Sequence, residues 1–355
     1  MRFAPPTAQL RILPGTELVP VDDSNVLLRS FFGTLLLSGE FAAAELPRVV
    51  GLAGMDASIA DLRDSVHGRF IADFDSFLEL LNTKGLLVEQ THGSPRRGDA
   101  AYWQSQGKSV EDSRRSLAAA TVTVAGSGSV AVTVANALLD GGVGTVRVAS
   151  EGRTSCALHL NSAAVQLAGA VDDLANWDEV VAQSSLVVLC GDDMSLAGYD
   201  RTNETCNTHR VAWTSARVDR TKGILGPFVL PDQTACFACF ELRSRANATH
   251  PSDHEALSRH WKTAARPQPE QWPIPLEFAS MLGSAAAIDA RRVLAGGFVS
   301  SVFGRMTHFD FHTLESSTHE VLKLPRCPVC SRTRNLPITR IWDLSESRAP
   351  QSVDS

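Results

Sequence analysis

TVTVAGSGSVAVTVANALLDGGVGTVRVAS occupies residues 121–150 and contains, in order, a short apolar run, a glycine turn, a longer apolar segment and a second short apolar run. This order predicts a strand, a helix and a strand joined as one βαβ unit. The turn fits the form G-x-G-x-x-G/A through Gly126, Gly128 and Ala131. Glycines at these positions permit a tight turn and let backbone N–H groups approach a phosphate at the helix N-terminus. The stretch therefore predicts an α/β domain with a candidate phosphate-binding turn.

Two further segments extend this domain towards the C-terminus. Residues 186–190 read LVVLC, which is typical of a buried strand, and they run into Gly191 and Asp192. Residues 276–294 have the length and composition of a long helix. Together these segments predict one α/β domain over residues 119–345.

Four cysteines form two Cys-x-x-Cys pairs that lie far apart in the sequence, Cys236 with Cys239 and Cys327 with Cys330. Thiolates in two closely spaced pairs suit a tetrahedral Zn2+ ion. Two disulfides, or four unrelated buried thiols, are the alternatives. The long gap must contain folded structure, so the metal would tie the end of a domain to its middle. A site with four thiolate ligands has no open position, which predicts a structural zinc and not a catalytic one.

Residues 1–90 predict a small α+β domain. Short apolar runs at 10–13, 18–21, 26–28 and 34–37, separated by turn residues, predict strands. Helices are expected at about 40–52, 58–66 and 70–82, and residues 86–88 can return as a strand. In the third helix Phe70, Phe74, Phe77 and Leu81 fall on one stripe. Strands with three helices and a closing hairpin form a winged-helix-like order, whose usual function is DNA binding.

The charge of the chain argues against that function. Residues 1–90 carry seven Lys or Arg and twelve Asp or Glu, and the whole chain has a net charge of -6. Nucleic-acid binding depends on cations that neutralise phosphates, so the sequence disfavours a transcription factor and any nucleic-acid partner. Peptides or proteins are the expected partners, and a homodimer is left open.

Composition marks the remaining boundaries. HGSPRRGD at residues 92–99 predicts a linker, and with a polar helix expected at about 110–119 it forms a connecting segment over residues 91–118. Residues 346–355 are expected to be a disordered tail. The chain has no charged-then-apolar leader and no apolar run near the roughly 20 residues of a membrane helix. These features predict a cytoplasmic protein without membrane contact.

The glycine turn followed by a late four-cysteine site resembles the ThiF and ubiquitin-activating-enzyme superfamily. GPFVLP at residues 226–231, just before TACFAC at 234–239, is similar to the divergent branch found with thiazole and oxazole peptide biosynthesis, the ocin-ThiF-like or cyclodehydratase-partner proteins. The resemblance covers nearly the whole chain. It implies a Rossmann-like α/β domain with structural zinc and an N-terminal winged-helix-like domain that recognises a precursor peptide.

Active members of the superfamily bind ATP and adenylate a C-terminal carboxylate, using an acidic residue for the ribose and Arg plus Lys for the phosphates. This chain has Ser150 where the resemblance places the acidic residue, and it has no Lys or Arg from Thr154 to Asp200. A triphosphate needs cationic or metal compensation in its site. The resemblance therefore implies that ATP is not a cofactor here.

The residues left from that site are expected to form a vestigial nucleotide turn, made of Gly126, Gly128, Ala131 and Asp192. Asp192 follows its strand where the superfamily places a magnesium-linked aspartate, although an exposed acidic turn also explains it. Arg217, Arg220 and Lys222 could supply charge from another loop. An active adenylating enzyme acting on a peptide or carrier-protein C-terminus is therefore the alternative function.

In the related recognition domains a leader peptide adds a strand to the edge of the small sheet and rests on the third helix. Transferred by position, the peptide-binding residues are Thr34, Leu35, Leu36, Leu37, Phe74, Phe77 and Leu81. The competing interpretation is that these side chains are the core of the domain. The resemblance thus implies a leader-peptide-binding adaptor in thiopeptide-like, azole-bearing peptide biosynthesis. Its partner would be a separate YcaO-type ATP-dependent cyclodehydratase.

Overall fold

The computed structural model describes residues 10–13, 15–30, 32–54, 57–89, 102–103, 106, 108–126, 128–149, 165–167, 174–191, 198–263, 274–296 and 303–331. The chain forms two compact units, residues 1–115 and 116–355. This division falls within the segment predicted as a linker, and the predicted domain boundaries at residues 90, 118 and 345 stay predictions. Asp192, Ser150 and the expected tail at 346–355 lie outside the described residues.

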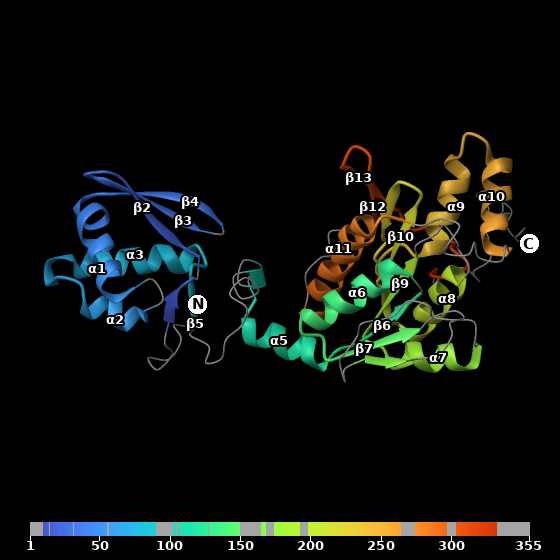
Figure 1. The fold of residues 1–355 in the computed structure, drawn as a ribbon, viewed down its shortest axis with the longest axis horizontal. Helices are drawn as coiled ribbons and strands as arrows, with labels where there is room; N and C mark the ends of the chain where they lie inside the picture. Colours follow the sequence, from blue (N-terminus) through green and yellow to red (C-terminus); the bar gives the residue numbers. More distant parts are fainter. Residues whose placement is uncertain are drawn as a thin grey trace, which may run out of the picture. The chain divides into compact units, whose positions relative to one another are not determined.

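The N-terminal unit is built from short strands and helices (Figure 1). Its elements are β1 (Leu10–Ile12), β2 (Glu17–Asp22), β3 (Asn25–Ser30), β4 (Gly33–Ser38), η1 (Phe41–Glu45), α1 (Leu46–Ala53), α2 (Ile59–Asp64), η2 (Gly68–Phe70), α3 (Ile71–Thr83) and β5 (Leu87–Glu89). The predicted order of strands, three helical segments and a last strand is confirmed. The helix expected at 40–52 differs in detail, because its first turn, η1, is a π-helix.

Two antiparallel sheets of this unit surround one apolar core. The strands β2, β3 and β4 form one sheet in that order, and β1 pairs with β5. The stripe predicted on the third helix faces the core, since Phe74, Phe77 and Leu81 are buried there. The ring of Phe41 from η1 packs against Phe74 and Phe77. Burial of these large side chains is the main source of the unit's stability.

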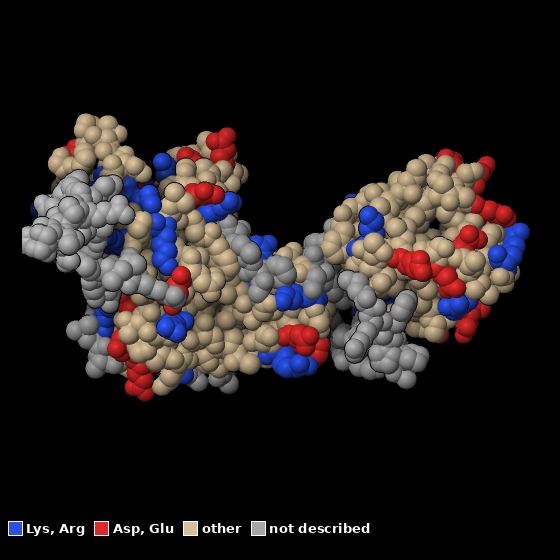
Figure 2. Space-filling model, turned by 180° about the vertical axis from the view of Figure 1, so that it is seen from behind, with Lys and Arg blue, Asp and Glu red and all other residues tan. Residues whose placement is uncertain are grey.

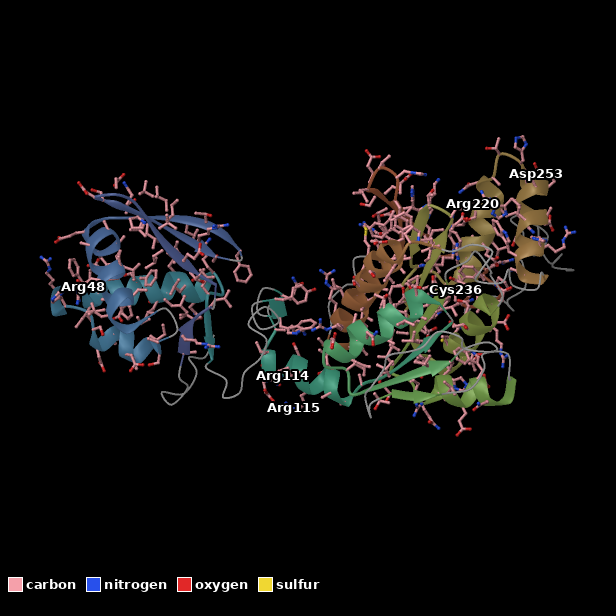
Figure 3. The ribbon with its side chains drawn as sticks, viewed as in Figure 1. Arg48, Arg114, Arg115, Arg220, Cys236 and Asp253 are labelled. Carbon is pink, nitrogen blue, oxygen red and sulfur yellow. The ribbon has the colours of Figure 1, made fainter. Side chains whose placement is uncertain are left out.

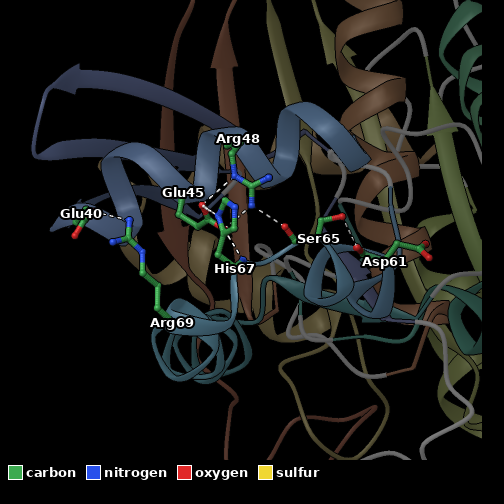
Figure 4. Close-up of polar contacts among 7 residues, drawn as sticks. All are labelled: Glu40, Glu45, Arg48, Asp61, Ser65, His67 and Arg69. Carbon is green, nitrogen blue, oxygen red and sulfur yellow. Dashed lines mark hydrogen bonds and ion pairs between the residues drawn. The ribbon is translucent and has the colours of Figure 1, made fainter.

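A buried carboxylate joins two helical segments of the N-terminal unit (Figure 4). Glu45, only 3% exposed at the end of η1, accepts hydrogen bonds from Nε of Arg48 at 2.9 Å and from the backbone N–H of His67 at 2.8 Å. Arg48 also donates to the carbonyl oxygen of Ser65 at 2.7 Å. The hydrogen bond from Arg48 lowers the pKa of Glu45 to about 2. Glu45 is therefore charged at neutral pH although it is buried.

The second unit contains a long mixed sheet with helices on both faces (Figure 1). From the helix that crosses the division between the units, the elements are α5 (Val110–Ala119), β6 (Thr121–Ala125), α6 (Ser129–Asp140), β7 (Thr145–Ala149), β8 (Val165–Leu167), α7 (Leu174–Ala182), β9 (Leu186–Gly191), α8 (Tyr199–His209), β10 (Ala212–Asp219), β11 (Lys222–Leu225), α9 (Phe237–Asn247), α10 (Pro251–Thr263), α11 (Leu276–Leu294), β12 (Arg305–Asp310) and β13 (Glu315–Glu320). The predicted βαβ unit and the predicted α/β class are confirmed.

The strand order of this sheet is β13-β12-β11-β10-β9-β6-β7-β8. The strands from β10 to β8 are parallel to their neighbours, and β11, β12 and β13 extend the sheet by antiparallel pairing. The chain reverses its direction of winding between β6 and β9, which are neighbours in the sheet. In open α/β sheets, ligands bind beyond the carboxyl ends of the strands at such a switch point.

Helices α6 and α11 pack on one face of the sheet, and α7, α8 and α9 cover the other. The pair α6 and α11 approaches closely because Gly283 lacks a side chain: a Cβ atom there would lie 2.8 Å from Cβ of Thr133. The opposite face holds a large buried cluster that includes Trp177, Trp213 and Phe237. This second face carries the cysteines.

None of the described helices is long and apolar enough to cross a membrane.

On the face that Figure 2 shows, acidic and basic side chains are interspersed over the N-terminal unit. Nucleic-acid binding depends on a predominantly basic surface, so this mixture of charges does not favour binding of a polyanion. The winged-helix assignment itself stays a prediction.

Candidate functional site

The four cysteines of the two Cys-x-x-Cys pairs meet in the core of the second unit. Their sulfur atoms all lie within 4.8 Å of one another, and all four residues are buried. The Sγ atoms of Cys236 and Cys327 are 3.5 Å apart, as are those of Cys239 and Cys330, and Cys236 and Cys239 are separated by 3.9 Å. A disulfide requires about 2.05 Å, so these pairs are not disulfides. Both alternatives to a metal site are thus excluded: the four thiols do not form disulfides, and they lie together in one cluster.

The spacing of the sulfur atoms fits a tetrahedral metal. With a Zn–S bond of about 2.3 Å, ligand sulfurs around Zn2+ are roughly 3.8 Å apart. The hydrogen bond that Cys236 donates to Cys239 raises the pKa of Cys236 and lowers that of Cys239. Four thiolates this close repel one another unless a cation lies between them. Cys236, Cys239, Cys327 and Cys330 therefore fit Zn2+ as a closed set of four ligands.

Each Cys-x-x-Cys pair, called a knuckle from here on, is held in place by local structure (Figure 3 marks Cys236). Helix α9 begins directly after Cys236, so Cys239 lies in its first turn. In the second knuckle, the backbone N–H of Leu324 donates to the sulfur of Cys239 at 3.4 Å, and that of Cys327 donates to the carbonyl oxygen of Leu324 at 3.2 Å. Hydrogen bonds of this kind orient ligands and favour their charged form.

Asn203 is a supporting residue that sequence reasoning missed. Its side-chain oxygen, buried on α8, accepts the backbone N–H of Phe237 at 3.0 Å. This bond satisfies one of the unpaired N–H groups in the first turn of α9, next to the ligand Cys236. The neighbouring Asn207 donates to the carbonyl oxygen of Val329, beside Cys330. A single asparagine in a polar helix carries no sequence signal for this role.

The glycine turn lies at the carboxyl end of β6, at the switch point of the sheet. Gly126 has φ of 130°, and a Cβ atom there would lie 1.9 Å from the carbonyl oxygen of Cys190 on the neighbouring strand. Gly128, with φ of 94°, precedes the first residue of α6, and Ala131 is buried against the sheet. Gly126 and Gly128 therefore both have the positive φ that favours glycine, and a phosphate-binding role of the turn stays a prediction. Close packing of β6 against β9 requires the first glycine whether or not a phosphate binds.

The three cations considered for a nucleotide differ in position. Arg220 and Lys222 are exposed at the turn between β10 and β11, whereas Arg217 is buried on β10. Figure 3 marks Arg220. The described residues of the glycine turn, namely 126 and 128–131, contain no cation. The described residues of the turn itself therefore supply no cation to compensate a triphosphate.

In the N-terminal unit, β4 is an edge strand of its sheet. Leu36 is 60% exposed, while Leu35 and Leu37 are half-buried and pack against the core cluster. Thr34 is exposed. Among the described strands β4 thus pairs only with β3, and peptide binding at this edge stays a prediction.

The side chains predicted to line the helix side of the groove are buried, unlike Leu36 on β4. Phe74, Phe77 and Leu81 are 1%, 5% and 0% exposed, so they belong to the core, as the competing interpretation expected. Contact of these three side chains with a peptide stays a prediction. The partly buried Leu78 on the same helix also packs against the core cluster.

Comparison with known proteins shows the fold of the chain. No family model and no curated protein matches the sequence. The chain is similar to the solved structure of E. coli MccB, with a TM-score of 0.68 and 12% identity, over 93% of this chain and 99% of MccB. It is also similar to the heterocyclase TruD, with a TM-score of 0.64 and 17% identity, over 94% of this chain and 45% of TruD. A heterocyclase in complex with substrate and cofactor matches over 93% of this chain and 40% of its own, with a TM-score of 0.62 and 18% identity.

These matches show the class of fold, an α/β chain of two units. The particular proteins that share it are MccB, along its whole length, and heterocyclases, of which this chain spans less than half. Each match covers more of the chain than either unit alone contains.

Proposed function

We propose that the chain is a member of the ThiF-like superfamily that binds a ribosomal precursor peptide during peptide modification. The observation that carries the proposal is the edge of β4, which pairs only with β3 among the described strands and whose inner side chains Leu35 and Leu37 pack against the core cluster. An extended leader peptide would add a strand to β4 through main-chain hydrogen bonds and place alternate side chains near Leu35 and Leu37. Thr34 and Leu36 would complete the edge.

The similar structures support a peptide as the ligand. One of them is MccB with a modified MccA peptide, and another is a heterocyclase with its substrate. In the proposed role, the second unit is a zinc-bearing scaffold that docks a separate YcaO-type cyclodehydratase, which forms azole or azoline rings in the captured peptide. The winged-helix-like character of residues 1–90 and a homodimer belong to the same proposal.

Binding of a fluorescent leader peptide to the full chain tests this function. Successive strand residues point to opposite faces, so Leu35 and Leu37 lie on the core side and Leu36 on the outer side. Leu35→Ser and Leu37→Ser are expected to weaken binding by at least tenfold, whereas Val19→Ser on β2 at the opposite edge of the sheet, the control, leaves it within about twofold. Absence of binding by the unchanged chain at tens of micromolar peptide contradicts the proposal.

A second function is favoured by the glycine turn at the switch point. The turn and the N-terminus of α6 could take a nucleotide, and MccB has been solved with ATP. In this case the chain would adenylate a peptide or carrier-protein C-terminus, using cations outside the described part of the turn. ATP–pyrophosphate exchange that depends on added peptide, and that is lost in Gly128→Val, would establish the enzyme and exclude the pure adaptor.

A further inference from the structure

Arg217 is a buried cation whose charge is not compensated. Its residue is 4% exposed, and its Nε and Nη1 atoms have no hydrogen-bond partner within the described part of the chain. Two other arginines show the usual pairing: Arg48 donates to Glu45, and Arg243 donates to the carbonyl oxygen of Leu322 at 2.6 Å. A guanidinium out of water is costly without an acceptor, so native proteins rarely leave one so.

The side chain of Arg217 lies against the ring of Tyr199 on α8. Its guanidinium carbon lies 5.2 Å from the ring centroid of Tyr199, which offsets part of the cost by a cation–π contact. The hydroxyl of Tyr199 is itself buried, with no partner among the residues that are described. The same holds for the hydroxyl of Thr202, one helical turn along α8, and for Nε1 of Trp213 on β10. The guanidinium of Arg217 and the hydroxyl of Tyr199 can therefore both donate to one anionic acceptor.

The place of Arg217 in the sheet suits a ligand. It lies near the carboxyl end of β10 and pairs in register with Gly191, the last residue of β9. This is the sheet edge that also carries the glycine turn, one strand beyond the switch point. Arg217 shares a row with Ile224 on β11 and His308 on β12. Burial lowers the pKa of His308, and the charges of His319 and Arg217 add to the effect.

We propose that Arg217, with the hydroxyl of Tyr199, binds a carboxylate at the carboxyl end of β10. One guanidinium balances a single negative charge, and its planar donors match a carboxylate group. A phosphate carries about two negative charges at neutral pH and would need a second cation. The nearest basic residues in sequence, Arg220 and Lys222, are exposed and do not provide one within the buried cluster. The carboxylate can be a free acid or the C-terminus of a peptide.

Thermal unfolding of the full chain with small anions tests the site. The probes are acetate, N-acetylglycine, its amide N-acetylglycinamide and inorganic phosphate, all at one ionic strength set with chloride. Acetate and N-acetylglycine are expected to raise Tm by about 3–5 °C at ten times their Kd, and the neutral amide is expected to leave it unchanged. Tighter binding of N-acetylglycine than of acetate identifies a peptide terminus, and equal binding identifies a free acid. A response to phosphate without a response to carboxylates overturns the assignment.

Two variants and a matched control separate binding from a structural role. Arg217→Met removes the buried charge, so the carboxylate response disappears while Tm without anion stays the same or rises. Arg220→Met, which removes an exposed cation three positions away, keeps the response. Tyr199→Phe is expected to weaken carboxylate binding about tenfold with little change in Tm. Lower Tm in Arg217→Met without anion, together with no carboxylate response in the unchanged chain, makes Arg217 a structural residue. If Arg217→Met does not fold, Tyr199→Phe decides: an unchanged carboxylate Kd overturns the proposal.

Discussion

The sulfur atom of Cys236 lies 3.5 Å from that of Cys327, although 91 positions separate the two residues in the sequence. The segment between them contains α9, α10, α11, β12 and β13, so this contact closes a large loop within the second unit. Because no ligand position remains open in a four-thiolate site, the expected role of a metal there is to stabilise the fold.

Loss of one ligand should uncouple the second unit from its metal. In Cys327→Ser the zinc content is expected to fall from about one ion per chain to well below half, and the second unit is expected to lose its cooperative unfolding. Zinc analysis and thermal unfolding check both results. Cys206→Ala is the control, because Cys206 is a buried thiol outside the cluster. Its packing loss should lower Tm and leave zinc bound.

Metal removal should also distinguish the two proposed roles, docking of a cyclodehydratase and binding of a leader peptide. Chelation is expected to unfold the second unit and abolish docking of a cyclodehydratase, while leader binding by the N-terminal unit survives. A peptide-binding assay and a pull-down on the same chelated sample compare these outcomes. Preserved docking with lost leader binding would show that the division of labour is wrong.

Asn203→Ala tests the support behind the knuckle. Removing the side-chain oxygen leaves the backbone N–H of Phe237 buried without its acceptor. The expected cost is about 1–3 kcal/mol of unfolding free energy, with a tenfold or greater loss in zinc affinity. Competition with a chromogenic chelator measures the affinity. Asn207→Ala, on the same helix and bonded to the second knuckle, is a comparison variant with a smaller expected effect because that bond is only part-buried.

Gly126→Ala is predicted to damage the fold and not only a ligand site. Its Cβ would lie 1.9 Å from a backbone oxygen, and backbone of two packed strands cannot move aside cheaply. A loss of about 3 kcal/mol or more is expected in denaturant unfolding. Gly142→Ala is the matched control. Gly142 also has positive φ but open space around it, so about 1 kcal/mol is expected there.

Acid should weaken the N-terminal unit through Glu45. Its folded pKa of about 2 lies below the ordinary 4.5 because Arg48 donates to it, so its stabilisation is present above pH 4.5 and is lost as the pH falls towards 2. Glu45→Gln is expected to cost about 1–3 kcal/mol at pH 7 and to flatten the dependence on pH in this window. Hydrogen exchange of α1 amides measures the effect, and the exposed Glu79→Gln should leave both quantities unchanged.

Much of the fold could be predicted because local pattern dominates in its elements. The helices α5 and α11 have the predicted bounds, because the composition of residues 110–119 and the length and composition of residues 276–294 indicate helices. The clustering of the four cysteines could be predicted because the spacing of two Cys-x-x-Cys pairs indicates a metal site. These features depend on neighbours in sequence or on one shared metal.

Other features depend on contacts between residues that are far apart in the sequence, so they could not be predicted from it. The acceptor role of Asn203 arises only after α8 packs against α9, and the burial of Arg217 arises from its register beside Gly191. The stripe of Phe74, Phe77 and Leu81 was visible, but whether it faces a core or a ligand depends on how completely the small sheet covers it. The first turn of the helix predicted at 40–52 is a π-helix, a detail that apolar periodicity does not specify.

Two edge strands of the described sheets, β13 and β4, differ in a way that bears on solubility. The edge strand β13 reads ESSTHE and is exposed and polar throughout, which discourages pairing with another chain. The edge strand β4 reads GTLLLS, with three consecutive leucines and no charge. Such an edge is prone to self-association when nothing pairs with it. The chain should therefore aggregate through its N-terminal unit when produced alone, and co-expression with its peptide should raise the yield of soluble material.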